Sequence, residues 1–114
     1  MRVLVCGGRD YRDRARAYAE LDRLPREGLV IITGAANGAD SLARDWCFAR
    51  DGVEIEQYPA DWKTYGKAAG PIRNQQMIDE GRPDLVLAFP GGRGTADMVK
   101  KAKAANIPVT EVKQ

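Results

Sequence analysis

The chain has 114 residues, 44% of them hydrophobic, which suits one domain over residues 1–114 with a real core. Charged residues make up 30% in mixed sign, and the net charge of +2 is too small to indicate nucleic-acid binding by bulk charge. Histidine is absent, and the two cysteines, Cys6 and Cys47, stand in no metal-ligand spacing, so we expect core thiols and neither a disulfide framework nor a metal site.

Apolar runs alternate with helical patterns in the first third of the chain. Residues 3–6 predict a fully buried strand, and a helix follows over residues 11–24. Residues 29–33 are continuous and β-branched, which is typical of a strand covered on both faces. The expected apolar face of the first helix comprises Ala15, Tyr18, Ala19 and Leu21.

The middle of the chain predicts a loop, a helix and a third strand. Residues 34–40 form the loop, and Asp40 or Ser41 stands where a helix N-cap is expected. That helix stops near Gly52. The partial alternation of residues 53–58 indicates a strand at a sheet edge.

The stretch from residue 59 to residue 70 is the least regular. Pro71 stands where the first residue of a helix is expected, because proline lacks the amide hydrogen that this position does not need. This helix ends at Gly81, and it would carry Arg73 in its first turn.

The last third predicts two more strands, residues 84–89 and 107–112, separated by the loop 90–95 and a helix. Strand–helix alternation implies parallel strands with right-handed crossovers. We therefore expect an α/β Rossmann-like three-layer sandwich with a five-stranded parallel sheet, in the order 3-2-1-4-5. Ligands of such sheets bind beyond the carboxyl ends of the strands, at the switch between strands 1 and 4.

The loop after the fourth predicted strand reads PGGRGT and supplies Gly91, Gly92, Gly94 and Thr95. Glycines let backbone N–H groups approach an anion closely, and the following helix adds its N-terminal dipole. We interpret this loop as a phosphate site, with a tight turn that binds nothing as the alternative.

Two other loops reach the same edge of the predicted sheet. Gly34 and Gly38 give the second one a further set of backbone donors, while Asp40 binds ligand or simply caps its helix. The first loop supplies Gly7, Gly8, Arg9 and Asp10. Its arginine suits a phosphate and its aspartate suits a ribose hydroxyl or Mg²⁺, unless both are merely solvated.

The GPIRN segment adds Arg73 and Asn74. A cation in the first turn opposes the helix dipole, so a bound anion would explain Arg73, with an exposed arginine as the alternative. Asn74 suits a base edge or a carbonyl. A stretch of interleaved aromatic and basic side chains, either a base-stacking surface or a connecting loop, contains Trp62, Lys63, Tyr65 and Lys67.

Four motifs in this order resemble the small SLOG-superfamily proteins of the YspA type. They are GGRD (7–10), TGAANGAD (33–40), AGPIRNQQM (69–77) and FPGGRGT (89–95). The resemblance covers nearly the whole chain. It implies a Rossmann-like fold that binds nucleotides or nucleotide-derived signals, and a homodimer.

Lonely Guy enzymes, which belong to the same superfamily, cleave the N-glycosidic bond of nucleoside monophosphates. Their loop reads PGGxGTxxE, and the glutamate acts with an arginine in a motif comparable to that around Arg73. Here the loop matches through Thr95, but Met98 takes the glutamate position. Asp97 lies about 100° away around the helix, so we do not expect it to reach the same point.

The sequence therefore favours a nucleotide-binding or nucleotide-sensing module, with Mg²⁺ accompanying the phosphates as an option. The first alternative is a phosphoribohydrolase-like enzyme, whose candidate catalytic residues are Arg73, Asp10 and Asp40. The second is a DNA-processing module, the role of DNA-processing protein A in this superfamily, although the weak net charge disfavours nucleic acid. Met1 leads directly into a strand without a secretory or membrane-spanning run, so we expect a cytoplasmic protein.

Overall fold

The computed structural model describes residues 1–113. Its sheet has five parallel strands in the order β3-β2-β1-β4-β5, as the sequence predicts. The strands are β1 (Arg2–Cys6), β2 (Val30–Thr33), β3 (Glu54–Gln57), β4 (Leu85–Ala88) and β5 (Val109–Glu111). The helices are α1 (Arg14–Asp22), α2 (Ala39–Phe48), α3 (Trp62–Tyr65), the short η1 (Gly66–Ala68), α4 (Ala69–Asp79) and α5 (Arg93–Ala104).

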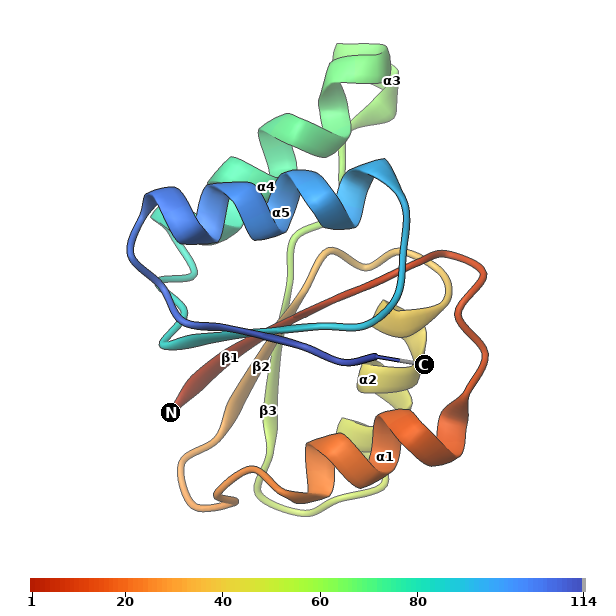
Figure 1. The fold of residues 1–114 in the computed structure, drawn as a ribbon, viewed down its shortest axis with the longest axis vertical. Coiled ribbons are helices and arrows are strands. Elements are labelled where there is room, and N and C mark those ends of the chain that lie inside the picture. The colour runs from red at the N-terminus through yellow and green to blue at the C-terminus, as the bar shows by residue number, and fades with distance from the viewer. Residues whose placement is uncertain (114) are drawn as a thin grey trace.

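Helices cover both faces of the sheet, which confirms the three-layer architecture. α1 and α2 lie on one face, α4 and α5 lie on the other, and α3 projects beyond the start of α4 (Figure 1). Successive residues of β1 point to opposite faces, so both cores need apolar side chains and the strand is apolar throughout. None of the helices within residues 1–113 is long and apolar enough to span a bilayer.

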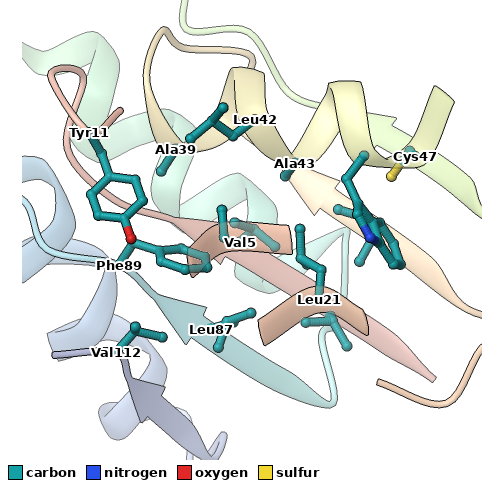
Figure 2. Close-up of a cluster of buried hydrophobic side chains, with 14 of the residues drawn as sticks. Val5, Tyr11, Leu21, Ala39, Leu42, Ala43, Cys47, Leu87, Phe89 and Val112 are labelled. Carbon is teal, nitrogen blue, oxygen red and sulfur yellow. The ribbon is translucent and has the colours of Figure 1, made fainter. Parts of the chain in front are cut away.

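Each face carries its own core. Figure 2 shows the α1/α2 side, where Val5 and Leu87 of the sheet meet Leu21, Leu42 and other side chains of the two helices. The second core packs β1 and β4 against α4 and α5. It contains Leu4, Cys6, Ile32, Met77, Ile78, Val86, Ala88, Met98 and Ala102. Cys6 and Cys47 are free, buried thiols, one in each core, as expected.

The first helix is shorter than the predicted range of residues 11–24, and its buried face is different. It begins at Arg14, because the Asp13 carboxylate caps it by accepting the Arg16 N–H at 3.0 Å. Ala17 and Leu21 are its buried residues. The prediction that Ala15 and Ala19 face the core was wrong. Their small side chains do not form an apolar stripe strong enough to identify the buried face of the helix from the sequence.

The start of α4 also differs from its prediction. The stretch 59–70, expected to be irregular, contains α3 and η1, and α4 begins at Ala69 directly after η1. Pro71 is therefore the third helical residue, which a helix tolerates because its first four amides have no intrahelical acceptor. Arg73 is therefore the fifth residue of α4, so the prediction that it lies in the first turn was wrong. The argument that repulsion from the helix dipole indicates a bound anion does not apply to this position.

Candidate functional site

Three loops meet at the carboxyl ends of β1, β2 and β4. The Gly8 N–H donates to the Pro90 carbonyl at 2.9 Å, which joins the β1–α1 and β4–α5 loops. The Gly8 carbonyl in turn accepts the Ala39 N–H, the first of α2, at 3.2 Å. Tyr11 packs on Phe89 below them, with ring centroids 5.2 Å apart (Figure 2). These contacts fix the backbone of the loops at the edge of the sheet where the fold predicts a ligand.

A cavity of about 600 Å³ opens between these loops and α4. It has the size of a small-molecule site. The candidate residues that line it are Gly7, Gly8, Arg9, Asp40, Arg73, Asn74, Gly92, Gly94 and Thr95. The structure therefore brings together most of the residues that the sequence singled out.

Four candidates do not line this cavity. Gly34 and Gly38 are buried in the β2–α2 loop, and Gly91 packs against the Gly8 amide, where a Cβ would lie 2.6 Å from the nitrogen. These three glycines shape the loops. Asp10 is exposed and lines a separate cavity of about 380 Å³ beside α1, which leaves it away from the other candidates.

Gly92 and Gly94 differ from the glycines that pack. A Cβ at either position would meet no protein atom within 4 Å, and neither has a positive φ. Gly92 is the N-cap of α5 and no side chain caps that helix. The first amides of α5 therefore have no intrahelical acceptor and face an open cavity. No packing contact and no positive φ requires glycine here, whereas close approach of a ligand would.

Arg73 is half-buried and held by the protein. Its Nη1 donates to the Gly34 carbonyl at 2.5 Å, and its Nε donates to Asn74 Oδ1 at 3.0 Å. Burial lowers the pKa of this guanidinium, and the Asp40 carboxylate opposes that change. Nη2 has no hydrogen-bond partner within residues 1–113, so this nitrogen is available to a ligand.

Asp40 is the second residue of α2 and does not cap it. The N-cap is Gly38, so the N-cap prediction for Asp40 or Ser41 was wrong. The Asp40 Oδ2 accepts instead from the preceding loop, from Gly34 N–H at 3.1 Å and Ala36 N–H at 3.2 Å. Burial raises the pKa of this carboxyl to about 6, against the opposing effect of those amides and of Arg73.

Asp97 also lines the cavity, although sequence reasoning gave it no role. The Asn74 side-chain amide donates to its Oδ2 at 2.9 Å, and Lys101 Nζ lies 2.6 Å from its Oδ1. Partial burial pushes the pKa of Asp97 up, but Lys101 and Asn74 outweigh this and hold it below its ordinary value. Met98, in contrast, is 1% exposed and belongs to the α4/α5 core. The sequence signal that could have pointed to Asp97 is its spacing from Lys101, one helical turn away, which places the two charges side by side.

Arg93 also lines the cavity, and Trp62 and Lys67 complete the set of charged and aromatic residues around it. Tyr65 and Lys63, from the same interleaved stretch, do not line it. Arg9 reaches across to Trp62, with its guanidinium carbon 5.1 Å from the ring centroid. The structure thus separates two side chains at the cavity from two outside it.

The family model described as YspA, cpYpsA-related SLOG family matches residues 1–65. The Gene 61 protein of Mycobacterium phage D29 is 41% identical over 117 residues, covering 95% of this chain and 93% of the phage protein. The chain belongs to this SLOG family. Membership indicates a nucleotide-related, ligand-binding role and leaves the ligand and any activity open.

A solved structure agrees with the SLOG chain in fold alone. The C-terminal domain of a hydrogenase from Pyrococcus furiosus has a TM-score of 0.51 and 16% sequence identity, and the match covers 97% of this chain and 90% of that one. At this identity the similarity carries nothing about the ligand.

Proposed function

We propose that the chain binds a nucleotide or a nucleotide-derived phosphorylated ligand in the 600 Å³ cavity, with a phosphate at the N-terminus of α5. The observation that carries this proposal is the open space above Gly92 and Gly94. The free amides of α5, its dipole and the Thr95 hydroxyl are suited to phosphate oxygens. Arg9 and Arg73 provide cationic side chains in the same cavity.

The proposed ligand fits the charges of the cavity better than a resident metal does. Within residues 1–113, no group of three or more His, Cys, Asp or Glu side chains could hold a metal ion. We therefore propose that any Mg²⁺ enters together with the phosphates. The homodimer stays a prediction of the family resemblance.

The first test is thermal unfolding in a panel of nucleoside mono-, di- and triphosphates, dinucleotides and cyclic nucleotides. A ligand at 100 times its dissociation constant adds about 2.7 kcal/mol to the free energy of unfolding. In a domain of this size, we expect the midpoint to rise by roughly ten degrees or more. Gly92→Ala should fold, since its Cβ meets no protein atom, and should unfold a few degrees below the wild type without ligand because alanine is a poor N-cap, but it should lose most of the ligand-induced rise.

The control for this test is Asp10→Ala, which changes a charged residue outside the cavity and should keep the full ligand-induced rise. A Gly92→Ala protein that responds to ligand as the wild type does would contradict the proposed position of the phosphate. An equal loss in both variants would also contradict it.

A second candidate function is hydrolysis of the N-glycosidic bond of a nucleoside monophosphate. The observation that favours it is the placement of Asp97 and Asp40 in one cavity with pKa values moved in opposite directions. An ionised Asp97 could stabilise the positive charge that develops on the ribose ring, and Asp40, with its pKa of about 6, could hold a proton below that pH and donate it to the leaving base. Attack of water on the sugar carbon would then release the free base.

Chromatography of nucleoside monophosphates incubated with the protein tests this candidate. If the enzyme function holds, free base accumulates and Asp97→Asn slows its release at least about a hundredfold, because the amide carries no negative charge. Binding of the nucleotide should survive this substitution. If no nucleotide that binds releases free base, the hydrolase function is contradicted and only the binding function stands.

A further inference from the structure

One exposed aromatic side chain is built into the cavity wall. Trp62 begins α3, which the Asp61 carboxylate caps by accepting the Thr64 N–H at 3.1 Å. The side chain lines the cavity and is nevertheless 47% exposed. α3 extends from the start of α4, beyond the edge of the sheet (Figure 1). A tryptophan with this much exposed surface at a cavity offers a large planar ring on which a ligand can pack.

The ring of Trp62 is positioned from two sides. Arg9, from the β1–α1 loop, places its guanidinium carbon 5.1 Å from the ring centroid, at cation–π distance. On α4, a Cβ at Gly70 would lie 3.4 Å from the Cη2 atom of Trp62, so the ring edge lies in contact with the helix surface. These contacts hold the indole beside the cavity.

Other exposed large apolar residues lack this placement. Tyr65 is 51% exposed and Phe48 is 72% exposed, but neither lines the cavity. Trp46, the other tryptophan, is fully buried and donates its indole N–H to Asp22 at 2.9 Å. Exposure and a place in the cavity wall coincide only at Trp62 among the aromatic side chains of residues 1–113.

We propose that Trp62 is the platform on which the ligand's base stacks, and that the ligand class is therefore a nucleotide with an intact base rather than a sugar phosphate. This inference rests on the proposed function and adds a second contact to it. The base would stack at Trp62 and Arg9, and the phosphate would bind at Gly92 to Thr95. An indole and a guanidinium plane both stack on any nucleobase, so the platform favours bases as a class.

Calorimetric titration with the four common ribonucleoside monophosphates and with ribose phosphate tests the platform. Stacking on one aromatic ring is worth about 1–3 kcal/mol, so the tightest nucleotide should bind roughly 5- to 150-fold better than ribose phosphate. Trp62→Ala should remove most of that ratio and leave ribose phosphate binding nearly unchanged. Trp62→Phe should retain much of the ratio, and Tyr65→Ala should retain all of it.

The possible failures are distinguishable. If nucleotides and ribose phosphate bind equally, or if Trp62→Ala keeps the wild-type ratio, the platform is wrong while the phosphate site stands. If no compound binds, or if Gly92→Ala weakens the binding of none of them, both the proposed function and the stacking platform are contradicted. Tryptophan fluorescence gives a second readout, because Trp46 is buried and only Trp62 should respond to a bound base.

Discussion

Replacing Gly38 by alanine should destabilise the protein by more than about 3 kcal/mol. Gly38 has φ +75° and ψ −124°, a conformation that L-residues rarely adopt. A Cβ there would also lie 2.6 Å from the Arg9 carbonyl carbon and oxygen, and closer still to the Gly8 carbonyl oxygen. Those atoms are backbone in the loop that accepts the first amide of α2, so neither side can move without breaking the loop junction.

Urea unfolding with Gly28→Ala as the matched control separates the two causes. Gly28 has φ +69°, but a Cβ there would meet nothing within 4 Å, so this variant should cost about 1 kcal/mol from backbone conformation alone. Equal losses of stability in the two variants would contradict the close packing of the β1–α1 and β2–α2 loops.

The free energy of unfolding of Asp40→Asn, relative to that of the wild type, should change with pH by up to about 3 kcal/mol. The buried Asp40 carboxyl has a pKa of about 6 in the folded protein against an ordinary 3.8, and that difference corresponds to about 3 kcal/mol. Between these pH values the folded chain keeps a proton that the unfolded chain has released. This contribution to stability is therefore present at low pH and is lost as pH rises toward about 6. Asparagine removes the charge and keeps an acceptor oxygen for the Gly34 and Ala36 amides.

Unfolding free energies measured from pH 4 to pH 7 check this expectation. The stability of Asp40→Asn relative to the wild type should rise across this window. Asp97→Asn is the control, since the pKa of Asp97 is lowered in the folded state, its stabilising contribution is lost mostly below pH 4, and the stability of this variant relative to the wild type should change little from pH 4 to pH 7. A relative stability of Asp40→Asn that stays flat with pH would contradict the buried, ionisable Asp40.

The sheet, and the edge at which its glycine-rich loops gather, could be predicted because they depend on local patterns. The strand at residues 29–33 has no polar side chain before Thr33, as burial on both faces requires, and the sparse alternation after residue 52 marks β3 as the edge. Glycine-rich loops after such strands must lie at one edge of a parallel sheet. The cavity between them follows from topology.

Side-chain partners could not be predicted, because they depend on packing between distant segments. The link from Asn74 to Asp97 requires α4 and α5 to lie side by side, and no local pattern gives their relative rotation. The same rotation turns Met98 into the core and Asp97 toward the cavity. Likewise, spacing alone did not tell Trp62 from Tyr65, since only the short α3 decides which ring reaches the cavity.

The central claim is that phosphate binds at the start of α5, and amide chemical shifts in a titration with adenosine monophosphate test it most directly. The account predicts that the largest shifts fall on the amides of residues 92–95 and 8–9 and on the Trp62 indole N–H, while the buried Trp46 indole N–H stays in place. Largest shifts at Lys100, Lys103 and Glu111, which line a neighbouring cavity of about 520 Å³, would contradict it.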